Sequence, residues 1–187
     1  MTTRANLILA ASTLLDQGGE GAVTLRAVGQ AAGVSHNAPY RHFRNRDALL
    51  AGVASADLET LGRRFRDIRG SEDAPANRLL NALGVLITFS RAHPARYRLV
   101  FGAPTLARDH PNLQASSAAC LAEIIALVDD CKAAKILADA PTKSLAGLLL
   151  AALHGLVLLE AQGQLQEGKG LPTLEQTMAL MVDLFSP

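Results

Sequence analysis

The stretch VSHNAPYRHF, residues 34–43, concentrates hydrogen-bonding side chains on a segment of one or two helical turns. Ser35, His36 and Asn37 can exchange hydrogen bonds with base edges, and Asn is the side chain best suited to adenine. Ala38 can contact a thymine methyl group. The chemistry that these four residues could perform is recognition of bases in the major groove, although a short polar helix that faces only water has the same composition.

Phosphate contacts are the second chemistry that this stretch offers. Tyr40 and His42 can donate hydrogen bonds to phosphate oxygens, and Arg41 and Arg44 add positive charge. Long charged side chains often lie on a solvated surface, so we expect Arg41 and Arg44 to be surface charges. Phe43 is apolar and is expected in the core.

Two short helices must position these residues. Residues 24–43 read as one helix, LRAVGQAA, and a second helix joined to it by an Ala-Gly-Val-Ser turn, which is a helix-turn-helix pattern. Thr24 can cap the first helix, and Gly33 can end it in a left-handed conformation. Gly29 lies in the middle of this helix, where Gly costs about 1 kcal/mol relative to Ala. The presence of Gly29 at this position therefore predicts that the second helix approaches closely here.

Pro39 determines where the second helix can begin. Ser35 is the candidate cap, but it would put Pro39 at the fourth helical position, where an N–H is missing and the ring crowds the Ser35 carbonyl. With His36 as the cap, Pro39 falls in the first turn and costs little. The sequence therefore predicts either a helix start one residue late or a loosened first turn.

The composition indicates an all-α protein. The chain of 187 residues is 49% hydrophobic, with no Trp, two Tyr and five Phe, which favours packed helices over a β-sandwich. Its length suits a single domain or a small module attached to a larger one. The apolar spacing predicts helices at 4–17, 46–68, 75–91, 94–101, 112–138, 142–165 and 173–185. The first of them is expected to end at the Gly18-Gly19 pair.

Charge is distributed unevenly along the chain. Residues 1–69 carry nine Arg against six acidic residues, whereas residues 70–187 carry nine basic residues against eleven acidic ones. A basic amino-terminal segment fits nucleic-acid contact by that end only.

Cys120 and Cys131 would lie about 16 Å apart along a straight helix, beyond disulfide reach. We expect free thiols in a cytoplasmic protein.

The block from Ala10 to Leu50, with TLRAVGQAAGVSHNAPYRHFRNRDALL at its centre, resembles the DNA-binding module of the TetR family of bacterial transcriptional regulators. In that family a Thr-capped helix, an Ala-Gly-Val-Ser turn and a recognition helix with Tyr and His-Phe follow one another. Two positions depart from the pattern: Arg46 stands where Lys is usual, which keeps the charge, and Pro39 stands where Leu is common. Residues 93–102 and 153–165 are similar to the WHG-type carboxy-terminal subgroup, although the Trp of that name is absent.

The resemblance implies a helix-turn-helix DNA-binding domain at residues 1–47, followed by a helical effector-binding and dimerisation domain at residues 48–187. It implies an operator in double-stranded DNA as the partner, read as a near-palindrome by a homodimer, and repression as the common mode. The protein would then act in the cytoplasm, on the nucleoid. The residues implied to contact DNA are Thr24, Arg26, Tyr40, His42 and Arg46 on phosphates, and Ser35, His36, Asn37 and Ala38 in the major groove.

Residues 144–159 are apolar on all sides of a predicted helix. Their 16 residues are fewer than the about 20 that span a bilayer, so we expect a helix buried in protein and no membrane partner. A monomer of this size would struggle to cover such a helix. We therefore expect the helices near 144–165 and 173–185 to form a four-helix interface in the homodimer.

A small, mostly apolar effector is expected between the helices at 75–91, 94–101, 112–138 and 142–165. Each candidate residue could equally be plain core, a helix end or a side chain bonded to the backbone. The effector would shift the helix at 46–68, with a coupling of about 1–3 kcal/mol. The candidate lining residues are Phe89, His93, Tyr97, Phe101, Cys120 and His154.

Catalytic patterns are missing from the sequence. It contains no His-Glu-x-x-His, no paired Cys motif, no Gly-rich phosphate loop and no Gly-x-Ser-x-Gly, and its five His are scattered. We expect no enzyme activity, no catalytic residues, no metal site and no cofactor. The alternatives are a helical enzyme and an interaction module that uses the helix-turn-helix only for packing. The second alternative does not explain the polar set, because packing alone does not require Arg26, Tyr40, His42 and Arg46 together.

Overall fold

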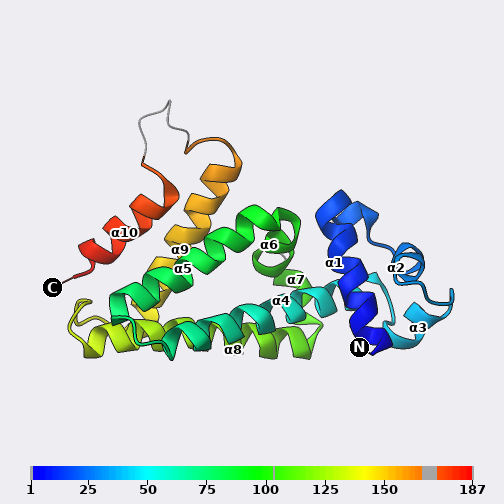
Figure 1. Ribbon diagram of the computed structural model, residues 1–187, viewed down its shortest axis with the longest axis horizontal. Coiled ribbons are helices and arrows are strands. Elements are labelled where there is room, and N and C mark those ends of the chain that lie inside the picture. The colour runs from blue at the N-terminus through cyan, green and yellow to red at the C-terminus, as the bar shows by residue number, and fades with distance from the viewer. Residues whose placement is uncertain (1, 103, 166–171, 187) are drawn as a thin grey trace. The chain divides into compact units, whose positions relative to one another are not determined.

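The computed structural model describes residues 2–102, 104–165 and 172–186, without the side chains of residues 104 and 105. Over these residues the chain forms ten α-helices and no strand (Figure 1), which confirms the predicted all-α fold. The helices belong to two compact units. Unit 1 holds Met1–Thr60 and Phe89–Ala119, and unit 2 holds Leu61–Thr88 and Cys120–Pro187.

Unit 1 is built around the first helix of the chain. Its helix α1 packs against α2, α3 and α6 and turns Leu7, Ala11 and Leu15 inward, all fully buried, at the four-residue spacing of one helical face. The short helix α7 was not predicted from the sequence. The elements of unit 1 are α1 (Thr3–Ala22), α2 (Leu25–Ala31), α3 (Ala38–His42), α6 (Pro94–Phe101) and α7 (Pro104–Arg108), together with the first residues of α4 (Arg46–Arg69) and of α8 (Pro111–Ala133).

Helix α1 is longer than the predicted 4–17. The Thr2 hydroxyl caps it by accepting a hydrogen bond from the Ala5 N–H at 3.3 Å. Its helical path is interrupted at the predicted Gly18-Gly19 pair, where Gly19 has φ 65°, and it then continues to Ala22. Glycine adopts this left-handed conformation at little cost, so the helix changes direction here instead of ending.

Helix α3 begins at Ala38, because Asn37 is its N-cap. The prediction of Ser35 as the cap is wrong, and so is the alternative of His36. Ser35 instead belongs to a turn in which its carbonyl accepts a hydrogen bond from the Ala38 N–H at 2.9 Å. Pro39 thereby occupies the first helical turn, where N–H groups have no helical partner and its missing N–H costs nothing. The helix therefore starts late, but by two residues from a Ser35 cap and not by the predicted one.

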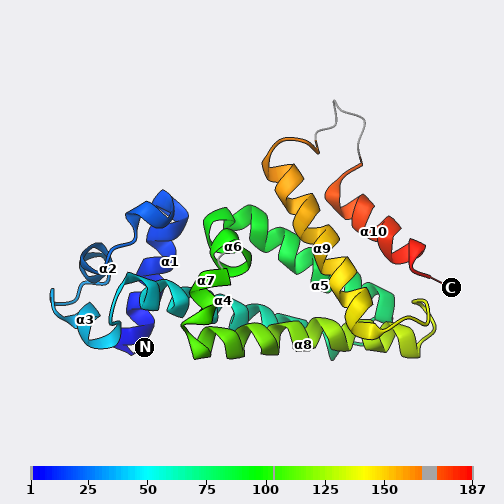
Figure 2. The same cartoon turned by 180° about the vertical axis from the view of Figure 1, so that it is seen from behind.

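Unit 2 contains α5 (Pro75–Ala92, except its last turn), α9 (Thr142–Ala161) and α10 (Leu174–Leu184), together with the end of α4 from Leu61 and most of α8. Helices α9 and α10 pack against each other and lie side by side in both views (Figures 1 and 2). A capping box between Thr173 and Gln176 begins α10. The fully buried side chains of unit 2 include Phe65, Leu79, Leu83, Leu127, Leu149, Leu153 and Leu174.

Two helices of unit 2 end before their predicted limits. Helix α8 ends at Ala133 and not at 138, because Lys135 adopts φ 58° and leaves the helical path. Helix α9 ends at Ala161 and not at 165, because Gly163 adopts φ 67°. A left-handed residue just past the last turn is a common way to end a helix. Apolar periodicity alone does not mark such a residue when it is Lys.

Helix α9 is not covered on every side within the chain. Leu148 and Leu158 are 55% and 57% exposed, and Leu159 is 41% exposed. By length and composition alone, α8 and α9 are each able to span a membrane, and only 28% of the most apolar 18-residue window of each is buried. Because α9 has 20 residues and not the 16 of its apolar run, its length does not exclude a membrane span. In the part of the chain that the structure describes, this apolar face of α9 is exposed.

Candidate nucleic-acid interface

The residues predicted to contact bases lie in the turn between α2 and α3. Ser35, His36 and Asn37 are exposed, and Ala38, the first residue of α3, is half-buried. The turn is held by hydrogen bonds from the Val34 N–H to the Gly29 carbonyl at 3.1 Å and from the Ala38 N–H to the Ser35 carbonyl. Three polar side chains are therefore presented to solvent together on an ordered turn.

Pro39 fixes the other side of α3 to α2. It is buried, and its Cγ lies 2.8 Å from the position that a Cβ on Gly29 would take. Real Cβ atoms essentially never approach another heavy atom this closely, so only glycine fits at position 29 without a shift of the ring. The prediction that Gly29 allows a close approach of the second helix is confirmed, and the contact partner is the proline itself.

The predicted phosphate contacts on α3 face solvent. Tyr40 is 52% exposed, and its ring centroid lies 6.0 Å from that of His36. His42 is also exposed, as are Arg41 and Arg44. Phe43 is 3% exposed, which confirms that it belongs to the core. The α3 side of unit 1 thus combines two cations with hydroxyl and imidazole groups.

Thr24 and Arg26 lie at the start of α2, where the helix N-terminus favours an anion. The Thr24 hydroxyl accepts a hydrogen bond from the Ala27 N–H at 3.1 Å, which confirms it as the cap, and its own proton stays available for donation. Arg26 is exposed. Both positions are compatible with a phosphate contact, which stays a prediction.

Arg46 has a second role that its sequence position does not reveal. Its Nε donates to the Val23 carbonyl at 2.8 Å, its Nη2 donates to the Glu20 carbonyl at 2.5 Å, and the same Nη2 lies 3.6 Å from the Glu20 carboxylate. Arg46 therefore closes the end of α1 onto the start of α4. A phosphate contact stays a prediction and would use its remaining N–H groups.

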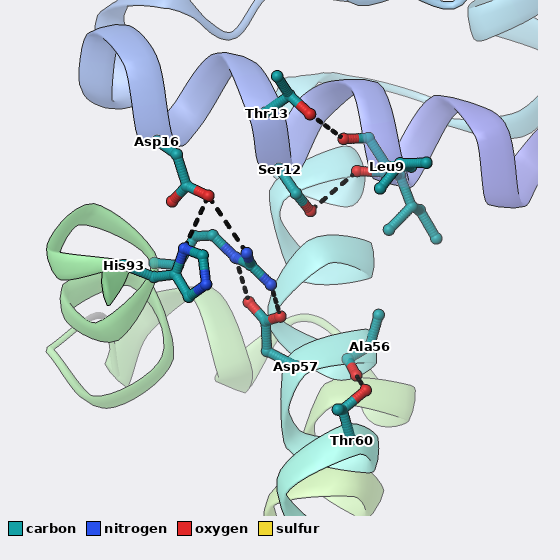
Figure 3. Close-up of polar contacts among 10 residues, drawn as sticks. Leu9, Ser12, Thr13, Asp16, Ala56, Asp57, Thr60 and His93 are labelled. Carbon is teal, nitrogen blue, oxygen red and sulfur yellow. Dashed lines mark hydrogen bonds and ion pairs between the residues drawn. The ribbon is translucent and has the colours of Figure 1, made fainter. Parts of the chain in front are cut away.

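Sequence reasoning missed an ionic cluster that joins α1, α4 and α6 (Figure 3). Arg96 donates from Nε to Asp57 at 3.0 Å and pairs with the same carboxylate through Nη2. Its Nη1 lies 3.3 Å from Asp16, and the His93 Nδ1 lies 2.8 Å from the same Asp16 oxygen. His93 had been assigned to an effector pocket, and no local pattern pairs it with a residue 77 positions away.

Burial makes this cluster energetically costly to break. The Asp57 and Arg96 side chains are 7% and 17% exposed. Burial raises the pKa of Asp57 above its ordinary value, although the hydrogen bond and charge of Arg96 oppose this. Burial lowers the pKa of Arg96, but its hydrogen bond to Asp57 and the two carboxylate charges raise it more. Asp57 depends on Arg96 for its charge in the folded chain.

The six predicted pocket residues fall in both units. In unit 1, Phe89, His93, Tyr97 and Phe101 form a row of rings, with centroid distances of 5.6 Å for Phe89–His93, 6.3 Å for Phe89–Tyr97 and 4.9 Å for Tyr97–Phe101. Tyr97 is buried, and burial raises its pKa.

In unit 2, Cys120 is buried and His154 half-buried. Burial raises the pKa of Cys120 to about 11 and lowers that of His154. Cys120 and Cys131 are both free thiols, as predicted. The assignment of all six residues as effector contacts stays a prediction.

Two sequence profiles match the chain. The profile described as "Bacterial regulatory proteins, tetR family" matches residues 7–53, and that described as "Tetracyclin repressor-like, C-terminal domain" matches residues 79–185. The second match alone covers more than half of the chain. No curated protein matches the sequence.

Solved structures match over nearly the whole chain. A protein of unknown function from Rhodococcus sp. RHA1 has 26% identity and a TM-score of 0.81 over 99% of this chain and 94% of that chain. The fatty acid degradation regulator FadR from Bacillus halodurans has 14% identity and a TM-score of 0.75 over 99% and 95%. RolR in complex with resorcinol has 18% identity and a TM-score of 0.71 over 98% and 87%.

FadR and RolR are too distant in sequence to show more than the fold, and membership of the WHG-type subgroup stays a prediction. The two profile matches cover both the helix-turn-helix and the carboxy-terminal helices. The chain belongs to the TetR family of bacterial transcriptional regulators.

Proposed function

We propose that this DNA-binding transcriptional regulator is a ligand-responsive repressor that binds a near-palindromic operator as a homodimer. The observation that carries the DNA contact is the exposed turn Ser35–Asn37 in front of α3, whose opposite side is held to α2 by Pro39 and Gly29. A rigid backbone with three outward polar side chains is what base recognition in the major groove requires.

The test is binding to DNA from upstream of its own gene, measured by fluorescence anisotropy at two salt concentrations. Specific binding must fall steeply with salt and must prefer this DNA over a scrambled sequence of the same length. Binding without sequence preference, or no binding at low salt, would contradict the proposal.

Two variants separate base contacts from phosphate contacts. His36→Ala is expected to cost about 1–3 kcal/mol at selected base pairs only, whereas Arg26→Gln is expected to weaken all sequences and to lower the salt slope by about one. Arg98→Gln, an exposed arginine on α6, is the matched control. Arg46 is a poorer probe, because its loss also opens the end of α1. Equal effects of His36→Ala and Arg26→Gln on every sequence would refute these roles.

The exposed apolar face of α9 and α10 supports the homodimer. On α9 the exposed residues Gly147, Leu148, Ala151, Gly155 and Leu158 recur at helical spacing. The α10 helix adds Leu180 and Leu184, which are 54% and 73% exposed. Small residues between leucines allow close helix packing, so a second copy is proposed to cover this face instead of lipid.

Light scattering after gel filtration tests this interface. Leu158→Asp is expected to convert dimer to monomer, because it would bury a carboxylate at the apolar contact. Leu9→Asp on α1 is the control, since both leucines are 57% exposed. A dimer that survives Leu158→Asp, or that Leu9→Asp disrupts equally, would place the interface elsewhere.

A small, mostly apolar effector is proposed to act on the row Phe89, His93, Tyr97 and Phe101, with Cys120 and His154 as further predicted contacts. The row continues into the Asp16–Arg96–Asp57 cluster, because His93 belongs to both and the Arg96 guanidinium lies 5.7 Å from the Phe89 ring centroid. The fold shared with RolR, which was solved with resorcinol, is consistent with a small ring-shaped effector.

Mass spectrometry of the purified protein would identify a retained effector, and its addition must weaken operator binding if the protein is a ligand-responsive repressor.

We further propose a division at residues 1–47 and 48–187 into DNA-binding and effector-binding parts, action in the cytoplasm on nucleoid DNA, and no catalytic role, cofactor or membrane partner. Binding titrations in which effector and operator are independent would contradict the coupling.

A further inference from the structure

A cavity of about 250 Å³ lies in unit 1, away from the row of aromatic rings. Five polar residues from α1, α3, α4 and the start of α8 line it: Arg4, His42, Ser55, His110 and Asn112. None of its lining residues carries a carboxylate. Another cavity of unit 1, of about 260 Å³, is lined by Glu20, Asp47 and Asp109, so an acid-free lining is not general in this unit.

Arg4 supplies an uncompensated positive charge at this cavity. Within the described residues no carboxylate lies within 4 Å of its guanidinium, which lies 5.3 Å from the centroid of the Phe43 ring. The ring orients the guanidinium without neutralising it. Arg4 is exposed, so water solvates this charge, and an anion in the cavity would replace that water with a charge-assisted hydrogen bond.

Ser55 provides an independent indication of a ligand. The residue is only 9% exposed, and its hydroxyl has no hydrogen-bond partner in the part of the chain that the structure describes. Ser12, a buried helical serine of the same unit, instead donates to the Ile8 carbonyl at 3.0 Å. Among the described residues Arg78 Nε is the one fully enclosed polar side-chain atom without a partner, so the Ser55 hydroxyl keeps access to the cavity and is free to bond a water or a ligand there.

The remaining walls define the kind of anion. Pro111, Asn112 and Leu113 form the first turn of α8, a helix of 23 residues whose N-terminal end favours negative charge. Phe43, Ala51 and Leu113 provide apolar surface. We propose that this cavity binds a small organic acid, with its carboxylate on Arg4, Ser55 and the start of α8 and its apolar part against Phe43 and Leu113.

A phosphate of DNA has related chemistry but fits the site less well. Ser55 and Leu113 are 9% and 4% exposed, whereas Arg4, His42 and Asn112 are exposed, so an anion that contacts Ser55 must reach below the surface. A phosphodiester flanked by two sugars cannot enter a cavity of about 250 Å³ to that depth, whereas a free carboxylate can. We therefore take a free anion as the occupant, and operator binding of Arg4→Gln tests the DNA backbone as the other source.

The occupant would connect α3 to α8 within unit 1, because His42 and His110 line the same cavity. This consequence rests on the proposed function, since His42 is also a predicted phosphate contact. Binding of the anion itself does not rest on it and is measured without DNA.

The experiment titrates the full-length protein with sodium benzoate, and with benzamide as its uncharged counterpart, by calorimetry at constant ionic strength. Benzoate is expected to bind once per chain, and benzamide at least about tenfold more weakly, since charge-assisted hydrogen bonds are lost. Arg4→Gln is expected to weaken benzoate about tenfold or more, and Ser55→Ala about two- to tenfold. Arg98→Gln, which lies outside the cavity, must leave benzoate binding unchanged.

Three results would overturn the site: equal binding of benzoate and benzamide, unchanged benzoate binding in both Arg4→Gln and Ser55→Ala, or an equal loss in Arg98→Gln. Circular dichroism checks that each variant is folded, and Ser55→Ala removes one hydroxyl without changing charge. Operator binding is measured separately. If Arg4→Gln weakens the operator but not benzoate, the site serves the DNA backbone and the proposal is wrong. If benzoate binds as expected but no operator is found, only the proposed function fails.

Discussion

Replacement of Arg96 by Gln is the perturbation that most directly tests the ionic cluster of unit 1. The substitution keeps a polar side chain but leaves Asp57, whose side chain is 7% exposed, without its cation. Removing one partner of a buried ion pair costs about 3–5 kcal/mol. The lost contact to Asp16, which is 27% exposed, adds at most about 1 kcal/mol. The expected loss in free energy of unfolding at pH 7 is therefore about 3–6 kcal/mol.

Urea unfolding of wild type, Arg96→Gln, Asp57→Asn and the double variant forms a double-mutant cycle. The double variant is expected to be more stable than Arg96→Gln alone, because no buried carboxylate is left unpaired. Arg98→Gln, exposed on the same helix, should change stability by less than about 0.5 kcal/mol. The reasoning fails if the double variant is as unstable as Arg96→Gln plus Asp57→Asn added together.

The dependence on pH has a defined sign. The pKa of Asp57 is raised in the folded chain, so the folded state holds its proton more tightly and the stability from this group falls as pH rises above the ordinary value of about 3.9. Arg96 lowers this pKa, so its removal raises the pKa further. The loss in free energy of unfolding caused by Arg96→Gln must therefore be smaller at about pH 5 than at about pH 7. An equal deficit at both would mean that Asp57 is not the group responsible.

Two further predictions concern a close contact and a half-buried histidine. Gly29→Ala is expected to destabilise the wild type by about 1–3 kcal/mol, because its Cβ would lie 2.8 Å from Pro39 Cγ. In a Pro39→Ala background the sign should reverse, since Ala is the better helix former, and destabilisation there would exclude the clash. Burial lowers the pKa of His154, so its contribution to stability is complete above the ordinary value of about 6.5 and is lost as pH falls through the folded pKa. His154→Gln should make the free energy of unfolding, measured in urea, depend less on pH between about pH 7.5 and 5.5. An unchanged pH dependence would mean that another group causes it.

Local sequence patterns predicted the elements better than their ends. The Thr24 cap depends on one residue and its immediate neighbours and is observed, and α10 starts within one residue of the predicted 173. The Gly18-Gly19 pair interrupts α1 but does not end it as predicted. The ends of α8 and α9 were misplaced because a left-handed Lys135 or Gly163 interrupts a pattern that stays apolar beyond it.

The start of α3 required knowledge of a neighbouring helix. From the sequence, Pro39 excluded a normal helix from Ser35, but two caps remained possible and both were wrong. The structure places Pro39 against Gly29, and this contact sets the position of α3. A proline can therefore mark the beginning of a recognition surface, and which residue begins it depends on the helix that the ring packs against.

The amino-acid sequence by itself determined the all-α class and the helix-turn-helix, and it supplied the residues that we predict to contact DNA, because these depend on periodicity and on side chains close together in the chain. Only the tertiary structure decided that His93 and Arg96 meet Asp16 and Asp57, that Arg46 closes the end of α1, and that Arg4 and Ser55 line one cavity. These partners lie tens of residues apart in sequence. Charge pairing and burial act through space, so no local pattern records them.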